Sequence, residues 1–246
     1  MCAEIVCGID ASPASVSAAY LAARLGRGLG FESVLVHTEP AARGPELAKA
    51  PLAHARELGR LHALVEANDF SAGASVEISE GDPGRELVRA AESHGANFAI
   101  VGSHGSAATQ AAVGGVTATV MRQAPCPVIV VPPRLRRRRS RTRGSYAVVC
   151  ALHETTGVGL RLAAGLVTRL GGHLHAIDTS RAGVADSDDA LLSLAEELPA
   201  DLLFVASLEA AARLVPRASC PTVMVPPSAE AGVSSREQFE VTHRVA

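Results

Sequence analysis

Two short segments of the chain carry residues suited to holding an anionic ligand. Gly8 and Asp10 end one aliphatic run, and Gly102–Gly105, with Ser103 and His104 at its centre, ends another. Glycines allow the backbone to approach an anion closely, and a carboxylate accepts hydrogen bonds from a ribose hydroxyl or an amino group. These residue types therefore indicate binding of a phosphorylated ligand.

The second segment runs on into a predicted helix that ends near Gln123. The residues at the start of this helix are Gly114, Gly115, Val116 and Thr117. A helix start offers unpaired N–H groups and a partial positive charge, which suit an anion. The dipole alone contributes only about 0.3–1 kcal/mol, so several donors must act together. Lys49 is the only lysine, so a phosphate site must otherwise use backbone N–H groups or arginine.

These segments follow predicted strands of an α/β fold. Aliphatic runs near 4–9, 33–38, 74–79, 98–102 and 127–131 alternate with helical stretches, which is typical of a mostly parallel sheet. Ser12-Pro13 and Asp82-Pro83 predict helix starts, and residues 44–68 predict a longer helix. Ligands of such sheets bind beyond the carboxyl ends of the strands, where the strand order reverses. If the first and fourth strands are neighbours there, Asp10 and the glycine segment share one crevice.

The chain repeats itself. Residues 4–10, 96–103 and 124–133 resemble, in the same order, residues 147–153, 200–207 and 218–227. The offset between the copies falls from 143 residues (Gly8 to Ala151) to 104 (Gly102 to Ala206) and then to 94 (Cys126 to Cys220). The second copy has therefore lost 143 − 104 = 39 residues and then 104 − 94 = 10.

We therefore predict two open parallel-sheet domains in tandem, the second truncated. The first covers 1–133 and the second 146–228, with strands near 146–151, 173–178, 202–206 and 222–225. A third strand and the long helix are missing from the second copy. An arginine-rich linker covers 134–145 and a polar tail covers 229–246.

Composition excludes several classes of function. The formal charge is −2, there is no secretory signal, and no apolar run approaches the roughly 20 residues that span a bilayer. Five cysteines without CxxC spacing favour buried, reduced thiols in a cytoplasmic protein. The linker has no interleaved aromatic residues, so we expect a solvated spacer and no nucleic-acid binding. His173 and His175 share one strand face, but no recognisable spacing completes a metal site, and we expect a half-exposed strand.

The first copy resembles the universal stress protein family along nearly its whole length. The matching segments are 6–13 (VCGIDASP), 33–37 (SVLVH), 81–83 (GDP), 101–105 (VGSHG) and Gly114 through the strand ending at Val131. The resemblance implies a five-stranded, flavodoxin-like (Rossmann-like) parallel sheet. Many members bind ATP at a Gly-x-x-Gly-x9-Gly-Ser/Thr loop, and others lack this loop and do not bind it.

Carried over by position, the resemblance gives roles to single residues. Gly102 and Gly105 match the first two loop glycines, Asp10 matches the family aspartate, and Thr38 matches a position whose backbone contacts adenine. The end of the loop departs from the pattern, because the third glycine falls on Gly114 or Gly115 and neither alignment places a hydroxyl after it.

Thr117, in the same helical turn, is the candidate replacement for that hydroxyl. A net hydrogen bond to a charged group is worth about 1.5–3 kcal/mol. Without the hydrogen bond from the loop hydroxyl, nucleotide binding is expected to weaken about tenfold or more but to persist.

The second copy departs further from the family pattern. His153 stands where Asp10 stands in the first copy, Ala206 and Glu209 replace Gly102 and Gly105, and the deletion removes most of the loop. We therefore expect no nucleotide there and a structural role. Residues 128–131 and 222–225 are expected to pair within the chain as a pseudo-dimer, and a further homodimer is left open.

The leading hypothesis is a stress-response regulatory module that binds ATP, or ADP or AMP, in its first half only. Mg²⁺ would enter only with the nucleotide, and the regulated protein partner is unknown. Two alternatives stay open: a nucleotide-free scaffold or interaction module, and a weak ATPase in which Asp10 or His104 orients water. No nucleophile elbow or Ser–His–Asp arrangement is legible.

Overall fold

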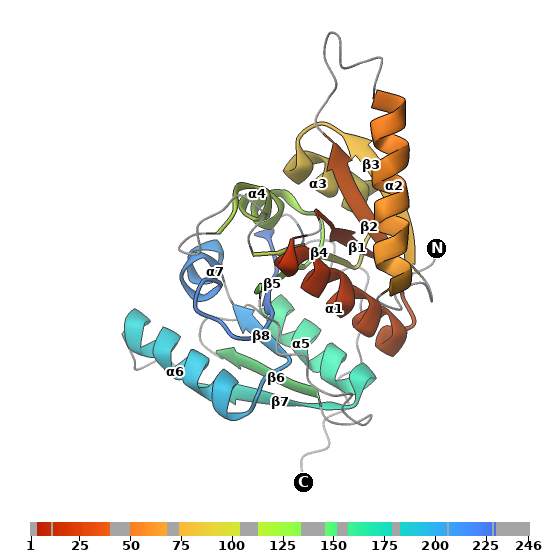
Figure 1. Ribbon diagram of the computed structural model, residues 1–246. Coiled ribbons are helices and arrows are strands. Elements are labelled where there is room, and N and C mark those ends of the chain that lie inside the picture. Colours follow the sequence, from red (N-terminus) through yellow and green to blue (C-terminus); the bar gives the residue numbers. More distant parts are fainter. Residues whose placement is uncertain are drawn as a thin grey trace.

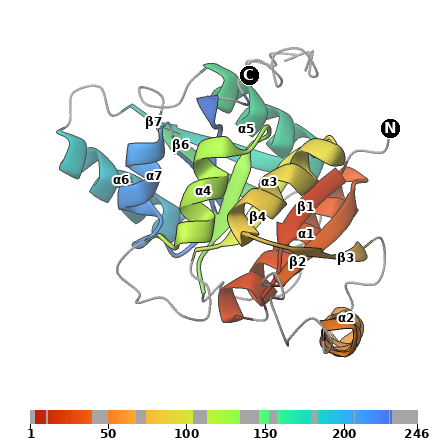
Figure 2. The ribbon, with the colours of Figure 1, turned by 90° about the horizontal axis from the view of Figure 1, so that it is seen from above.

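The computed structural model describes residues 4–10, 12–39, 50–67, 74–103, 113–133, 146–151, 157–178, 183–205, 207–227 and 229. Within them, nine strands form one sheet in the order β3-β2-β1-β4-β5-β9-β8-β6-β7. Helices cover both faces of this sheet (Figures 1 and 2).

The first half contributes five parallel strands. Its elements are β1 (Glu4–Gly8), α1 (Pro13–Leu29), β2 (Glu32–Glu39), α2 (Ala50–Ala67), β3 (Ala74–Glu80), α3 (Pro83–Ser93), β4 (Phe98–Gly102), α4 (Gly115–Gln123) and β5 (Val128–Val131). The chain order reverses at β1, which lies between β2 and β4.

The second half contributes four strands that are parallel to one another. Its elements are β6 (Tyr146–Ala151), α5 (Gly157–Leu170), β7 (Gly172–Ile177), α6 (Val184–Glu197), β8 (Leu202–Val205), α7 (Leu208–Leu214) and β9 (Thr222–Met224). The order β7-β6-β8-β9 repeats β2-β1-β4-β5, and the described residues contain no counterpart of β3 or α2.

The two halves join through an antiparallel pair of strands. Val128, Ile129 and Val130 of β5 pair with Met224, Val223 and Thr222 of β9. This confirms the predicted pairing within the chain. The pairing covers the edge that each strand would otherwise expose.

Two apolar cores lie on opposite faces of the sheet. Strand residues alternate between them, so that Ile5 and Cys7 join Leu21 of α1 on one face, whereas Val6 joins Leu87 of α3 on the other. Both cores contain residues from both halves. The halves are therefore held together by buried apolar surface as well as by the strand pair.

The predicted strand ends agree with the structure to within one residue. The helix starts are also confirmed, since the Ser12 hydroxyl accepts a hydrogen bond from Ser15 N (3.2 Å) and the Asp82 carboxylate accepts one from Arg85 N (2.9 Å). The predicted helix over 44–68 is observed over Ala50–Ala67. Residues 44–49, the predicted linker over 134–145 and nearly all of the predicted tail lie outside the described residues.

The four described cysteines are buried and reduced, as expected. They are Cys7, Cys126, Cys150 and Cys220. Desolvation raises the pKa of the Cys220 thiol to about 12 and also raises that of Cys7. These thiols are therefore protonated and unreactive at neutral pH.

Candidate functional site

The carboxyl ends of β1 and β4 lie side by side at the point where the strand order reverses. Cys7 of β1 pairs with Ile100 of β4, and each strand ends one or two residues later, at Gly8 and Gly102. The predicted neighbouring of these two strands is confirmed. It brings the Asp10 turn and the start of the glycine segment to the same edge of the sheet.

Asp10 lies in a closed turn that leads into α1. Its carboxylate Oδ1 accepts a hydrogen bond from Ser12 N (3.0 Å), and its own N–H donates to Ser15 Oγ (3.2 Å). The Ser15 hydroxyl in turn donates to the Ser12 carbonyl (3.1 Å). These bonds fix an exposed carboxylate in one orientation, so Asp10 both forms the turn and faces solvent.

Ser15 was not singled out from the sequence. It is buried, and it links the Asp10 backbone to the first turn of α1. The available signal was its position three residues after the capping Ser12, where a polar side chain commonly returns to the helix entry.

Gly102 is required by packing, whether or not a ligand binds. A Cβ at this position would lie 2.8 Å from Ala14 Cβ and 2.9 Å from the Ala14 carbonyl carbon. The end of β4 therefore touches the first turn of α1 backbone to backbone. Gly8 is less constrained, because the nearest atom to a Cβ there would be at the flexible end of Leu87, at 3.1 Å, and the Val101 side chain would lie at an ordinary contact distance of 3.8 Å.

The two ends of the glycine segment are tied together. Ser103 is buried, its N–H donates to the Val131 carbonyl (2.8 Å), and its carbonyl accepts from Gly114 N (3.1 Å). His104 and Gly105, between these ends, lie outside the described residues, so their roles stay predictions.

The start of α4 carries no side-chain cap. Gly114 occupies the N-cap position with extended backbone (φ −63°, ψ 153°), and the first turn contains no acidic residue. Gly115 is exposed with open space around it, and Val116 is 42% exposed. Among the described residues, no side chain accepts a hydrogen bond from the first-turn N–H groups, which are the groups that bind anions.

Thr117 does not face outward from this turn. It is 2% exposed, and its hydroxyl donates to the Gly102 carbonyl at 2.7 Å. The structure thus differs from the expectation that Thr117 offers its hydroxyl to a phosphate, because that proton is already used to join α4 to the end of β4.

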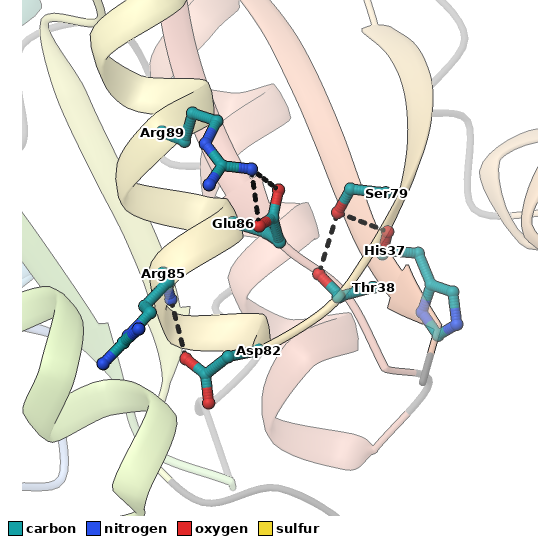
Figure 3. A network of polar contacts seen from close by, with 7 residues as sticks. All are labelled: His37, Thr38, Ser79, Asp82, Arg85, Glu86 and Arg89. Atoms are coloured by element: carbon teal, nitrogen blue, oxygen red, sulfur yellow. Dashed lines mark hydrogen bonds and ion pairs between the residues drawn. The ribbon is translucent and has the colours of Figure 1, made fainter. Parts of the chain in front are cut away.

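Thr38, the last residue but one of β2, lies within a small polar network (Figure 3). Its hydroxyl lies 3.1 Å from the Ser79 hydroxyl, which in turn lies 3.5 Å from the His37 carbonyl. The His37 ring Nδ1 lies 2.8 Å from the Ile9 carbonyl, so this nitrogen carries a proton and donates it. The network positions Thr38 and fastens the end of β2 to the turn that holds Asp10.

The equivalent helix start in the second half is closed by its own side chains. Ser207 caps α7 by accepting from Ala210 N (3.2 Å), and Glu209 lies in the first turn. Hydrogen bonds from its own backbone N–H and from Ser207 lower the pKa of the Glu209 carboxyl. A negative charge therefore already occupies this turn. His153 and Ala206 lie outside the described residues.

The described parts of the chain show neither a metal site nor a membrane-spanning helix. No group of three His, Cys, Asp or Glu side chains there is arranged to hold a metal ion. The rings of His173 and His175 lie 6.4 Å apart on β7. None of the helices in these parts has the length and apolar character needed to cross a bilayer.

Comparison with known proteins assigns the family. The model of the universal stress protein family matches residues 1–132. The chain belongs to the universal stress protein family. No curated protein matches it.

Solved structures with a similar fold extend across both halves. A universal stress protein from Archaeoglobus fulgidus matches with a TM-score of 0.65 at 18% identity, covering 91% of this chain and 96% of its own. A protein of unknown function from Pseudomonas aeruginosa matches with a TM-score of 0.56 at 15% identity, covering 95% and 96%. At these identities the likeness shows the fold alone.

A universal stress protein in complex with cAMP matches 54% of this chain and 98% of its own at 20% identity, with a TM-score of 0.42.

Proposed function

We propose that this universal stress protein binds an adenine nucleotide, ATP or its products ADP and AMP, at the carboxyl edge of its first half only. Occupancy would regulate binding to a protein partner. One observation carries the proposal: α4 begins without a side-chain cap, whereas its counterpart α7 is neutralised by Ser207 and Glu209. An anion is attracted to the first helix start and repelled by the second.

The proposed site draws on backbone groups more than on side chains. The first-turn N–H groups of α4, at Gly115, Val116 and Thr117, would hold the phosphates with the segment Gly102–Gly105. Asp10 would accept from the ribose or the adenine amino group, and the Thr38 backbone would contact the base. Gly8 would keep the end of β1 free of side chain. Mg²⁺ would arrive with the nucleotide.

In this proposal Thr117 has a supporting role. Its bond to the Gly102 carbonyl holds the helix start against the end of β4. The Ser/Thr hydroxyl that the family loop offers to the phosphate then has no replacement here. This predicts weaker binding than the family pattern would give. The second half serves as a structural partner, a degenerate copy that covers β5. The family is typically cytoplasmic, and we propose the same location here.

Thermal unfolding with ATP, ADP, AMP and cAMP, each with and without Mg²⁺, tests the proposal. A ligand at 100 times its dissociation constant stabilises by about 2.7 kcal/mol. For a chain of this length, that raises Tm by roughly 5–10 °C. Gly105→Val should abolish the shift and Glu209→Gln, in the second half, should leave it intact. If none of the nucleotides shifts Tm at millimolar concentration, the proposal is wrong.

The second candidate is a nucleotide-free scaffold. The inward Thr117 hydroxyl favours it, because the site then lacks a hydroxyl donor for phosphate. Purified protein that carries no nucleotide, does not respond to any, and still forms a stable partner complex would establish this alternative.

A further inference from the structure

The two halves meet through α1 and α5, which lie on the same side of the sheet (Figure 1). Both helices end at a left-handed glycine, Gly30 (φ 73°) and Gly171 (φ 68°). When the two helices are aligned at these glycines, Arg24 corresponds to Gly165 and Gly28 corresponds to Arg169. Corresponding positions of the two helices therefore carry opposite residue types, a large cation on one side and a glycine on the other.

One pair of contacts shows that the halves face each other reciprocally. Gly28 touches Leu170, since a Cβ at Gly28 would lie 2.6 Å from Leu170 Cδ2. At the matching place, Arg169 Nη2 donates to the Leu29 carbonyl at 2.7 Å. Both contacts join the same pair of equivalent helix positions. Only in the contact made by Arg169 of the second half does a cation reach the other half.

A second contact between the halves is an ion pair at only one of the two matching places. Arg24 Nη2 lies 3.3 Å from Asp201 Oδ1, and the Asp201 side chain is only 4% exposed. The guanidinium also stacks over the Tyr146 ring, 5.1 Å from its centroid. The pair joins α1 of the first half to the start of β8 in the second.

The counterpart of Asp201 in the first half is the neutral Asn97. The Asp201 N–H donates to the Ala147 carbonyl (2.7 Å) and Asp201 Oδ2 accepts from Ala147 N (3.0 Å). Asn97 makes the same two bonds with Glu4, at 2.8 Å and 3.2 Å. The local role is thus identical, and only the charge differs. Phe98, the residue after Asn97, lines a small pocket together with Gly165 and Arg169, and Arg169 donates there to the Leu29 carbonyl.

We propose that these positions make the surface of the first half specific for the second half of the same chain and unsuited to another copy of itself. In a pair of two first halves, Arg24 would face Asn97 twice, so both guanidinium groups would lose their carboxylate. The Leu29 carbonyl would lose its Arg169 donor as well. In a pair of two second halves, Asp201 would face Gly165, which would leave two buried carboxylates without a cation. Pairing of a first half with a second half is therefore favoured in two ways. The contacts across it attract, and the pairs of two first halves or two second halves each carry an energetic penalty.

A double-mutant cycle in the full chain measures this preference. Asp201→Asn recreates the Arg–Asn contact of two first halves, and Arg24→Gly recreates the Gly–Asp contact of two second halves. The double variant recreates the combination of glycine and asparagine that the chain carries at the matching positions Gly165 and Asn97. The helix cost of glycine is present with either partner residue and cancels in the cycle.

The expected result is non-additivity. The two single variants together should lose about tenfold more in the unfolding equilibrium constant than the double variant loses, since a hydrogen bond between charged groups is broken in each. Additive losses would overturn the proposal. If the glycine variant does not fold, Arg24→Ala completes the same cycle.

The exposed pair Arg217–Asp189 provides the matched control, because its side chains are 50% and 65% exposed. Arg217→Ala and Asp189→Asn should couple by less than about fivefold. Coupling as large as that of Arg24 and Asp201 would mean that any charge pair gives this result, and the inferred specificity would be wrong.

Discussion

Gly115 is the first residue of α4, and a carboxylate introduced there can change ligand binding without a steric effect on folding. A Cβ added there meets no atom of the described parts of the chain within 4 Å, and the residue is exposed. Gly115→Asp therefore fits without displacing a neighbour. It gives α4 the negative first turn that Glu209 already gives α7.

The variant should be more stable than the parent without ligand. Replacing a helical glycine gains up to about 1 kcal/mol, and a carboxylate at a helix start adds roughly 0.3–1 kcal/mol. Nucleotide binding should weaken at the same time. Repulsion between two like charges about 4 Å apart is about 1 kcal/mol in water and about 4 kcal/mol at an effective dielectric constant of 20. The dissociation constant should therefore rise at least about fivefold.

Thermal unfolding and calorimetric titration with ATP check both effects, with Gly115→Asn as the uncharged control. The control should keep the parent affinity within about twofold, since it adds similar volume without charge. Unchanged ATP affinity in Gly115→Asp would show that the phosphates do not lie at this helix start. Equal weakening in both variants would point to shape instead of charge, which would also refute the reasoning.

Three further outcomes follow from the contacts described. Gly102→Ala should destabilise the fold by about 1–3 kcal/mol in chemical denaturation, because its Cβ would overlap Ala14, whereas Gly8→Ala should lose less. Cys7 and Cys220 should resist a thiol reagent at pH 8 until the protein unfolds, and rapid labelling of either would contradict their burial. The lowered pKa of Glu209 means that its contribution to stability is present above its ordinary value of 4.5 and is lost as pH falls through the lower folded value. Glu209→Gln should therefore flatten the acid limb of the stability curve, and an unaltered limb would be evidence against those hydrogen bonds.

Much of the fold could be predicted because local signals and the repeat agreed. Ser12-Pro13 and Asp82-Pro83 carry their own capping chemistry, and the aliphatic runs admit few alternatives to buried parallel strands. The β5–β9 pair was foreseen because both copies present the same edge sequence. These features depend on residues close together in the chain or on comparison of the chain with itself.

The site was less predictable because its details depend on distant contacts. The presence of a hydroxyl at Thr117 was legible, but its direction is decided by the Gly102 carbonyl, 15 residues away. Gly102 matched a ligand loop, although the approach of Ala14 already requires a glycine there. The Arg24–Asp201 pair spans 177 residues, and no spacing rule connects such positions.

The antiparallel junction of β5 and β9 has a consequence for how the molecule meets other proteins. Within each half all strands run one way, and across the junction they run oppositely. The carboxyl ends of the first-half strands and those of the second-half strands therefore lie at opposite ends of the molecule. A small molecule bound at one end leaves the other end accessible, so the protein could bind a ligand and a protein partner at the same time without steric competition.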